Sequence, residues 1–397
     1  MGHGGMSRRP PPAGTGTIVI ISDRVEHCPQ ALQCHADEQL AGADLDASVV
    51  VEGGYLERLP LALIAAGRFA TAEIWHHATG TSHCTAVRHS SRLVRRTFPL
   101  DQPQAPFDNA AMARHLRDHG PPDLLVVYGL GVSEEVLAAA EGAVIVYNSI
   151  DAPSLRVPFE VSRHFDVVLA GAQWQADEIR ARHPETPAPI LPVGPEFAAT
   201  DQLRPLHGEK DYDLVYVAAA QPYKRHDILF DAVERLAGRV RALCVFGYGE
   251  LAEPYRQEIA ARALPIDCVM PPVVPFDEVN RLMNRAKIGI VAGIDDGAPA
   301  IITEYMLAGL PVLANSDLRC GLQYLLPGTG EIAAAGDWPG TIEAMLVRIE
   351  TYRPREIALA KWSWPVTAAR FLSLYDDARH SKTGRHNNPA CEKVSPC

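Results

Sequence analysis

Short apolar runs, many of them β-branched, recur along the chain between stretches whose apolar residues return every three or four positions. Continuous runs of this kind are typical of strands buried on both faces of a parallel sheet, and the periodic stretches are typical of helices that cover it. The runs are Thr17–Ser22, Ser48–Val51, Asp123–Tyr128, Ala143–Tyr147 and Asp166–Ala170, then Asp213–Ala218, Ala242–Phe246, Lys287–Val291 and Pro311–Ala314. The pattern predicts an α/β fold that occurs twice in the chain.

A segment of weak apolar periodicity, residues 195–211, separates the two series of runs. It reads as an interdomain linker with a boundary near residue 205, so we expect an N-terminal domain over 15–204 and a C-terminal domain over 205–363. The polar ends, 1–14 and 381–397, are predicted to be disordered. Because open parallel sheets bind ligands beyond the carboxyl ends of their strands, we expect the chemistry in a cleft between the domains.

Composition narrows the class of protein. The chain has 397 residues, 47% of them hydrophobic and 21% charged, which suits two globular domains and excludes fibrous or disordered classes. Its 48 acidic and 37 basic residues give a net charge of −11, which makes nucleic acid a poor partner. The sequence shows no membrane-spanning run and no signal-peptide core, so we expect a cytoplasmic protein.

Cysteine and histidine give weak signals. The 8 cysteines are thinly spread and form no CxxC pair, so neither a disulfide framework nor a redox motif is expected. The histidine-rich stretch 75–84 is interpreted as a polar loop. A metal site is the alternative there, but its spacing matches no recurrent zinc pattern.

Glycines follow two of the predicted strands. Residues 246–252 superficially fit a dinucleotide-binding fingerprint, which leaves a nicotinamide oxidoreductase as an alternative. The acidic residue that should end the next strand, Asp267, instead precedes an apolar run. Gly247 and Gly249 are therefore better explained by a tight turn beside a ligand, and Gly129 and Gly131 have the same ambiguity.

Two cations, Lys224 and Arg225, stand between a predicted strand and the helical pattern at 228–236. Cations at a helix N-terminus are unfavourable for the helix dipole, so the pair suggests a missing anion such as a diphosphate. A solvated basic turn is the alternative.

The richest segment follows the predicted strand at 287–291. The strand leads into Asp295 and Asp296, a turn at residues 297–299 exposes backbone amides, and Glu304 lies among apolar neighbours. A carboxylate in such surroundings needs a hydrogen-bond partner, which the hydroxyls of a sugar would supply. A helix cap or a buried salt bridge is the structural alternative.

These residues resemble the retaining glycosyltransferases of family four, which have the two-domain GT-B fold. Seven residues separate Asp296 from Glu304, as in the family's paired acidic motif, and five further positions fall in register: Gly297, Pro299, Gly309, Pro311 and Val312. The resemblance extends to four other segments: 190–197 is similar to the hinge motif, 247–249 to the glycine turn, 272–279 to the base-reading segment, and 361–364 to an aromatic motif before a last helix, 364–380, that crosses back to the first domain.

The resemblance implies transfer of a sugar from a UDP- or GDP-linked donor to a small-molecule acceptor, with retention of configuration and without metal or cofactor. Lys224, Arg225 and Asp296 would be catalytic, the two cations on the leaving diphosphate and Asp296 on the donor sugar. Glu304 would hold the ribose. The other donor-binding positions would be Gly247, Val274, Gly297, Ala298, Pro299, Ile301 and Ile302, and the acceptor side would contain Asp23, His27 and Asp151.

Four departures from the family pattern bear on the function. Asp296 replaces the usual Glu, Ala219 replaces an Arg, Asn148 to Asp151 replaces a His-Asp pair, and residues 21–28 replace a glycine-rich loop. The shorter Asp296 implies an unusual donor sugar or sugar pose, and Arg225 would supply the charge missing at Ala219. The loss of the glycine-rich loop indicates a specialised acceptor, compatible with antibiotic or other secondary metabolism. A sugar-nucleotide epimerase and a non-catalytic nucleotide-sugar binding protein remain alternatives. The oligomeric state is open, with a dimer among the alternatives.

Overall fold

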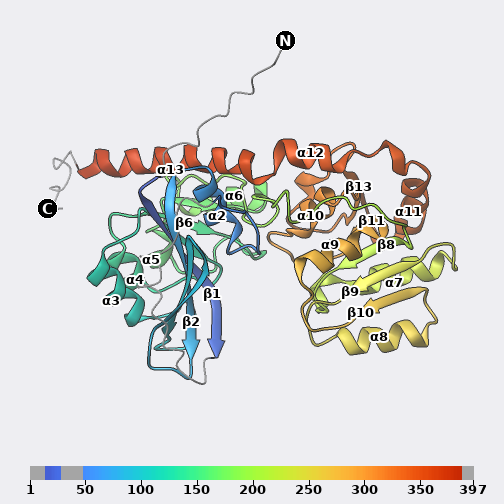
Figure 1. Ribbon diagram of the computed structural model, residues 1–397, viewed down its shortest axis with the longest axis horizontal. Helices are drawn as coiled ribbons and strands as arrows, with labels where there is room; N and C mark the ends of the chain where they lie inside the picture. The colour runs from blue at the N-terminus through green and yellow to red at the C-terminus, as the bar shows by residue number, and fades with distance from the viewer. Residues whose placement is uncertain (1–13, 28–47, 387–397) are drawn as a thin grey trace, which may run out of the picture.

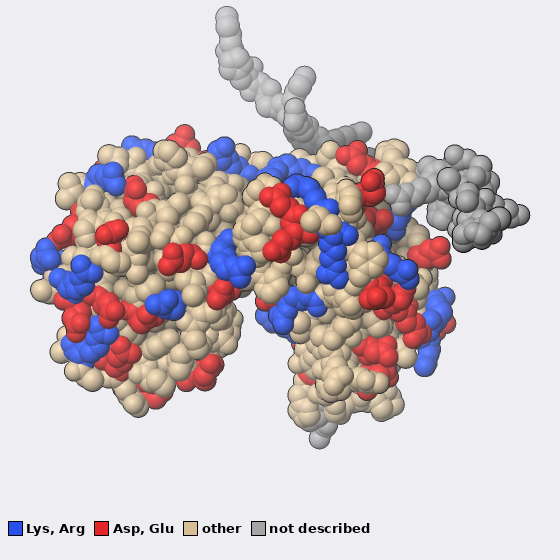
Figure 2. Space-filling view, turned by 180° about the vertical axis from the view of Figure 1, so that it is seen from behind, with Lys and Arg blue, Asp and Glu red and all other residues tan. Residues whose placement is uncertain are grey.

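The computed structural model describes residues 14–27 and 48–386. Two α/β lobes lie side by side, and a long C-terminal helix runs along one edge (Figure 1). The face in Figure 2 shows a notch between the lobes, with basic and acidic side chains interspersed over both.

The N-terminal lobe is a seven-stranded sheet in the order β3-β4-β2-β1-β5-β6-β7, in which every neighbouring pair is parallel except β3 and β4. Its strands are β1 (Gly16–His27), β2 (Phe69–Thr79), β3 (Thr85–Ser90), β4 (Leu93–Pro99), β5 (Leu124–Tyr128), β6 (Val144–Asn148) and β7 (Val167–Leu169). Its helices are α2 (Arg58–Ala65), α3 (Ala110–His119), α4 (Glu134–Ala139), α5 (Phe159–Ser162) and α6 (Gln173–Arg182).

Alternation along β1 divides the core of this lobe. Ile18 and Ile20 pack in one apolar cluster with α2, whereas Val19 and Ile21 pack in another with α3, α4 and α6. Successive side chains of a strand point to opposite faces, so the sheet is buried on both sides as the apolar runs predict.

The C-terminal lobe is a wholly parallel six-stranded sheet in the order β10-β9-β8-β11-β12-β13. Its strands are β8 (Tyr212–Val217), β9 (Ala242–Val245), β10 (Ile266–Val269), β11 (Ala286–Val291), β12 (Val312–Asn315) and β13 (Gly330–Ala333). One face is covered by α7 (His226–Arg235), α8 (Ala252–Ala261) and α11 (Trp338–Val347), the other by α9 (Phe276–Asn284), α10 (Ile301–Leu307) and α12 (Pro354–Lys361). Short 3₁₀ turns are η1 (Pro222–Lys224), η2 (Leu322–Tyr324), η3 (Ala335–Asp337) and η4 (Ile349–Thr351).

The strand order reverses between β8 and β11, which are neighbours in the sheet although three helices separate them in the chain. Such a switch point opens a crevice at the carboxyl ends of the two strands. The expected α/β class with two Rossmann-like lobes is confirmed.

The last helix, α13 (Trp364–His386), spans about 34 Å and lies along the N-terminal lobe (Figure 1). Phe371 and Tyr375 pack into the core of that lobe, and Arg68 on its surface pairs with Asp376 at 2.7 Å. The helix continues to His386, so the prediction of a disordered tail from residue 381 is wrong for 381–386. Gly14, which was also predicted to be disordered, donates its amide to the Gly67 carbonyl at 3.1 Å. The other residues predicted to be disordered, 1–13 and 387–397, lie outside the described part.

The start of the linker is buried, although its apolar periodicity is weak. Glu196, Phe197, Ala198 and Ala199 are all buried, and the Phe197 amide donates to Thr367 Oγ1 on α13 at 3.0 Å. The start of the linker is therefore packed between α13 and the two lobes rather than exposed.

The interpretation of the histidine-rich stretch as a loop is wrong for residues 75–79, because Trp75, His76 and His77 lie in the buried part of β2, whereas residues 80–84 do form a loop. Burial lowers the pKa of His76 to about 3 and that of His77 to about 4, so both imidazoles are neutral. His77 Nδ1 lies 3.2 Å from Asn109 Nδ2. Among the described residues, no group of three or more His, Cys, Asp or Glu side chains gathers as a metal would require.

Other strand predictions also need correction. Residues 48–51 form no strand, and the pattern missed β2, β3, β4, β10 and β13. Three of these, β3, β10 and β13, are edge strands whose side chains are only partly buried. Over residues 14–27 and 48–386, no helix has the length and apolar character needed to cross a membrane.

Candidate active site

Lys224 and Asp296 meet at the switch point of the C-terminal sheet. Lys224 ends η1, after β8, and Asp296 lies in the loop after β11. Their side chains form an ion pair, and each is less than a fifth exposed. Burial alone would lower the pKa of Lys224, but the Asp296 carboxylate and the Tyr223 phenol raise it above its ordinary value. Lys224 is therefore positively charged at neutral pH. It lies at the switch point, where open α/β sheets bind their ligands.

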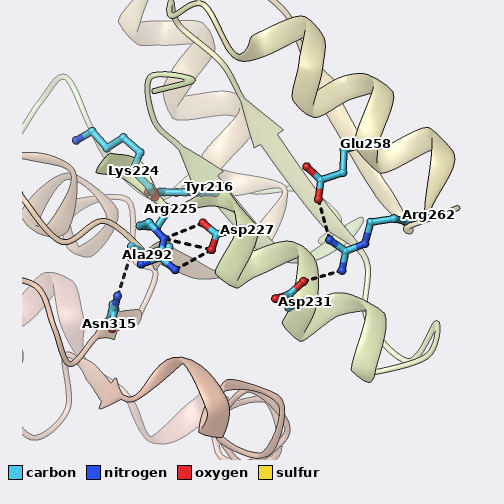
Figure 3. Close-up of polar contacts among 9 residues, drawn as sticks. All are labelled: Tyr216, Lys224, Arg225, Asp227, Asp231, Glu258, Arg262, Ala292 and Asn315. Atoms are coloured by element: carbon cyan, nitrogen blue, oxygen red, sulfur yellow. Dashed lines mark hydrogen bonds and ion pairs between the residues drawn. The ribbon is translucent and has the colours of Figure 1, made fainter. Parts of the chain in front are cut away.

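Arg225 does not join Lys224 in this pair. It has φ of 50°, and its guanidinium turns to Asp227, with Nε 2.9 Å from Oδ1 and Nη2 2.7 Å from Oδ2. Figure 3 shows the two cationic side chains pointing in different directions. The anion that the sequence suggested for Arg225 is thus supplied within the chain, by a carboxylate in the first turn of α7 that also suits the helix dipole.

Two aromatic side chains that the sequence analysis missed pack against the turn at Lys224 and support it. The Tyr216 hydroxyl donates to the Lys224 carbonyl at 2.5 Å (Figure 3). His226 is buried between Tyr216, Phe246 and Tyr255, and burial lowers its pKa to about 3. A neutral His226 therefore supports the turn without adding charge to it.

The loop after β11 touches the N-terminal lobe directly. The backbones of Asp151 and Asp296 form an isolated antiparallel β-bridge. A Cβ on Gly297 would lie 2.2 Å from the Asp151 carbonyl carbon, and a Cβ on Gly171 would lie 2.1 Å from the Gly297 carbonyl oxygen. Glycine at both positions is what permits this approach.

Side chains close the same edge of the cleft. Trp174 Nε1 donates to the Arg319 carbonyl at 2.8 Å, and Gln323 Nε2 donates to the Gly171 carbonyl at 2.7 Å. The lobes therefore meet along several backbone and side-chain contacts beside Asp296.

Glu304 has a partner that the sequence analysis did not identify. Its Oε1 accepts from Arg58 Nη2 at 2.6 Å, and Arg58 belongs to α2 in the N-terminal lobe. Arg58 is 1% exposed and Glu304 is 12% exposed. Of the alternatives for Glu304, the structure thus shows a buried salt bridge, and this bridge joins the two lobes. The clue in the sequence was a single arginine at the start of an apolar helix.

Four other donor-side candidates lie in the loop after β11 and at the start of α10. Ala298 packs near Gly194, Pro299 near Gly321, and Ile301 is half-buried at the start of α10. Ile302 is buried and its amide donates to the Pro299 carbonyl at 3.2 Å, so that amide is already used.

Two further candidates flank the crevice. Gly247 follows β9, where a Cβ would meet no atom within 4 Å, whereas Gly249, at φ of 115°, lies against the Ala220 backbone. The turn therefore requires Gly249 more than Gly247. Val274 precedes α9 and is partly buried. Ala219, where the family has an arginine, is buried.

A cavity of about 830 Å³ opens between α9, the linker and the N-terminal lobe. Its walls include Val51 and Glu57 from the N-terminal lobe, Arg204 from the linker, and Phe276 and Asn280 from α9. The cavity has the volume of a small-molecule site.

The acceptor-side candidates separate into a pair and an outlier. Asp23 and Asp151 form the pair. Burial raises the pKa of Asp23, and the nearby Asp151 charge raises it further. Arg156 Nη1 forms an ion pair with the Asp151 carboxylate at 2.8 Å. His27 ends β1, with Nδ1 3.5 Å from Thr79 Oγ1. Within the described part of the chain, no hydrogen bond or ion pair joins His27 to that carboxylate pair.

Residues 200–329 match the family model described as glycosyl transferases group 1. This part of the chain, which includes most of the C-terminal lobe, therefore resembles a group 1 glycosyl transferase domain. The matched residues include Lys224, Asp296 and Glu304, so the ion pair at the switch point and the interlobe salt bridge both involve this domain.

Solved structures share the two-lobed GT-B fold of this chain. Sucrose-phosphate synthase from Thermosynechococcus elongatus matches with TM-score 0.65 at 16% identity, over 92% of this chain and 100% of that one. HepE of Anabaena, in a complex with UDP and glucose, matches with TM-score 0.63 at 12% identity, over 91% and 100%.

The pneumococcal O-GlcNAc transferase GtfA, in a complex with UDP and GlcNAc, matches with TM-score 0.55 at 14% identity, over 68% of this chain. The match spans 60% of the GtfA chain. At these identities the likeness shows the fold. A search of curated protein sequences found no match.

Proposed function

We propose that this protein transfers a sugar from a UDP- or GDP-linked donor to a small-molecule acceptor with retention of anomeric configuration. The observation that carries the proposal is the buried Lys224–Asp296 ion pair at the switch point, inside the group 1 domain and against Asp151 of the other lobe. Two structures of the same fold hold UDP together with a sugar.

Lys224 would stabilise the leaving diphosphate. Breaking the bond between the anomeric carbon and the diphosphate leaves negative charge on oxygen, and a preorganised cation aimed at that oxygen lowers the barrier. Lys224 is poorly hydrated, so it loses little hydration when it leaves Asp296 for phosphate. The amides of Gly297 and Ala298 lie in the same loop and would bind the remaining phosphate oxygens.

Asp296 would then accept hydrogen bonds from the donor sugar, and Glu304 from the ribose. Asp296 is one methylene shorter than the family's usual Glu, so the sugar would lie closer to the loop. The acceptor hydroxyl would attack the anomeric carbon as the bond to phosphate breaks, and its proton would pass to the leaving phosphate oxygen. This scheme needs no covalent sugar intermediate, metal or cofactor.

The acceptor would lie against Asp23 and Asp151. Their carboxylates, with Arg156 beside Asp151, offer hydrogen-bond acceptors and one cation to a small polar molecule. The departures from the family pattern on this lobe support a specialised acceptor, and a role in secondary metabolism is part of the proposal.

A non-catalytic nucleotide-sugar binding protein is the second candidate. Ala219 lacks the family's cation, and the structure engages Arg225 with Asp227, so Lys224 would face the diphosphate with less help. A sugar-nucleotide epimerase would differ from both candidates in its product, which is an isomerised nucleotide sugar formed without an acceptor.

Thermal shift with UDP, GDP, ADP, dTDP and NAD tests the donor site. A ligand at a hundred times its dissociation constant adds about 2.7 kcal/mol of stability. We expect a shift with UDP or GDP, reduced in Lys224→Met and retained in Lys287→Met, whose parent lysine pairs with Asp213. A shift with NAD alone would overturn the proposal.

Incubation with the matching nucleotide sugar and a panel of acceptors then tests catalysis. Proton NMR of the new anomeric centre reports retention or inversion. An isomerised nucleotide sugar without acceptor product would indicate an epimerase, and donor binding without any turnover would favour the non-catalytic candidate.

A further inference from the structure

Arg58 is a buried cation that the N-terminal lobe extends to the other lobe. It opens α2, in which all residues but the last are buried, and its neighbours on that helix pack in the N-terminal core. Its own ion partner, Glu304, lies in α10 of the C-terminal lobe. A guanidinium that is 1% exposed has lost most of its contact with water, and the ion pair with Glu304 offsets part of that cost.

Contacts from both lobes fix the guanidinium. Nε donates to the Gly53 carbonyl at 2.9 Å within the N-terminal lobe, and Nη2 donates to Glu304 Oε1 at 2.6 Å across the cleft. The guanidinium carbon also lies 5.7 Å from the centroid of the Phe276 ring, which opens α9. Phe276 lines the large cavity between the lobes.

The hydrogen bond from Arg58 uses one carboxylate oxygen of Glu304 and leaves the other oxygen for a ligand. Among the described side chains, the hydrogen bond to Glu304 is made at Oε1, and no partner of Oε2 is seen. An ionised carboxylate has acceptor capacity at both oxygens. Arg58 therefore orients the Glu304 carboxylate and leaves Oε2 available to a hydroxyl.

The pair persists while the lobes are closed. Removing Glu304 from Arg58 would leave a guanidinium buried without an anion, which is costly. Arg58 cannot turn away alone, because α2 is embedded in the core of its lobe. A ligand that binds Glu304 in the closed form thus binds beside Arg58 rather than in its place.

We propose that Arg58 is a positioning residue of the donor site, supplied by the opposite lobe. It orients Glu304 so that Oε2 accepts a hydrogen bond from the ribose diol of the donor. This inference rests on the proposed function, in which Glu304 holds the ribose. Because the contact exists when the lobes meet, donor binding and lobe closure favour each other.

Calorimetric titration with UDP, GDP and their 2′,3′-dideoxy analogues tests the inference. The variants are Arg58→Met, Glu304→Gln and the double variant, compared with the wild type. Arg92→Met is the matched control, because Arg92 is a buried arginine of the same lobe whose Nη1 lies 3.4 Å from the Ala70 carbonyl. We expect Arg58→Met to weaken UDP or GDP binding on the order of tenfold.

The dideoxy analogues and the double variant make the assignment specific. Arg58→Met should change the affinity for a dideoxy analogue little, and the double variant should bind no worse than Glu304→Gln. If Arg58→Met does not fold, as judged by near-ultraviolet circular dichroism, Arg58→Lys replaces it. A lysine cannot hold both the Gly53 carbonyl and the carboxylate in this geometry, so a smaller loss is expected.

Each other outcome counts against a defined statement. Unchanged or tighter binding in Arg58→Met, or an equal loss with the dideoxy analogue, overturns the inference about Arg58. A wild type that binds UDP and its dideoxy analogue equally shows that the diol is not read, although the donor site stands. A wild type that binds no nucleoside diphosphate removes the proposed function as well.

Discussion

Asp151 of the N-terminal lobe and Asp296 of the C-terminal lobe pair their backbones in an isolated antiparallel β-bridge. Their side chains turn to different cations, Asp151 to Arg156 and Asp296 to Lys224. The loop that carries the catalytic candidate is therefore built partly on a contact with the other lobe. Shifts between the lobes should move Asp296 relative to Lys224.

Gly297→Ala should disturb this contact. The new Cβ would lie 2.2 Å from the Asp151 carbonyl carbon, and backbone cannot move aside as a side-chain end can. We expect kcat/KM to fall by about a hundredfold, as displacements of about 1 Å do, with a smaller change in the affinity for UDP or GDP. Steady-state kinetics and calorimetry measure both.

Gly340→Ala is the control for that substitution, because a Cβ there meets no atom within 4 Å. It should keep wild-type kinetics. Equal kinetics for Gly297→Ala and Gly340→Ala would show that the bridge does not contribute to activity.

Lys224 and Arg225 should differ in their effect on catalysis. Lys224→Met removes the cation at the switch point, and we expect kcat/KM for the donor to fall on the order of a hundredfold or more. Arg225→Met breaks a half-exposed pair with Asp227, which contributes about 0–1 kcal/mol to stability, and should cost much less activity. If both variants lose activity equally, Arg225 must leave Asp227 to reach the diphosphate.

Chelation should leave activity intact. In the proposed scheme Lys224 and the loop amides neutralise the charge that a divalent ion would otherwise carry. Assays with EDTA in excess, before and after dialysis, check this. Loss of activity that Mg²⁺ or Mn²⁺ restores would contradict the metal-free proposal.

The fold followed from local patterns where strands are buried on both faces. β5, β6, β8 and β11 are largely apolar runs, and the predicted strands lie nearly where the structure has them. β2 was missed because its buried half carries His76 and His77, whose polarity masks their burial. The edge strand β10 is short and half-exposed, so its pattern resembles that of a loop.

The candidate site divides in the same way. Lys224 and Asp296 are conspicuous in the sequence because each follows a strand. Arg225 could have been assigned to Asp227, only two residues away, by local reasoning. The pair of Arg58 and Glu304 spans 246 residues, and no local pattern encodes which helix of one lobe meets which helix of the other.

Glu196 gives the linker a pH dependence. Its side chain is 3% exposed, lies 3.2 Å from Arg370 Nη1 on α13, and accepts a long hydrogen bond from the Tyr324 hydroxyl. Burial raises the pKa of Glu196 from 4.5 to about 7, although Arg370 and Tyr324 oppose the shift. The folded chain therefore holds a proton on Glu196 at pH values where the unfolded chain has lost it.

The sign of the effect on stability follows from that difference. Between pH 4.5 and about 7 the folded state binds the extra proton, so the free energy of unfolding decreases as the pH rises, by about 3 kcal/mol over the whole window. Glu196→Gln removes this contribution, so the variant should gain stability relative to the wild type from pH 5 to pH 7.5. Arg370→Met removes the opposing cation and should extend the wild-type decrease above pH 7.

Urea unfolding at a series of pH values measures the stability of the wild type and both variants, and contributions from other titrating groups cancel in the differences. Parallel stability curves for the wild type and Glu196→Gln would show that the buried carboxyl titrates at its ordinary value.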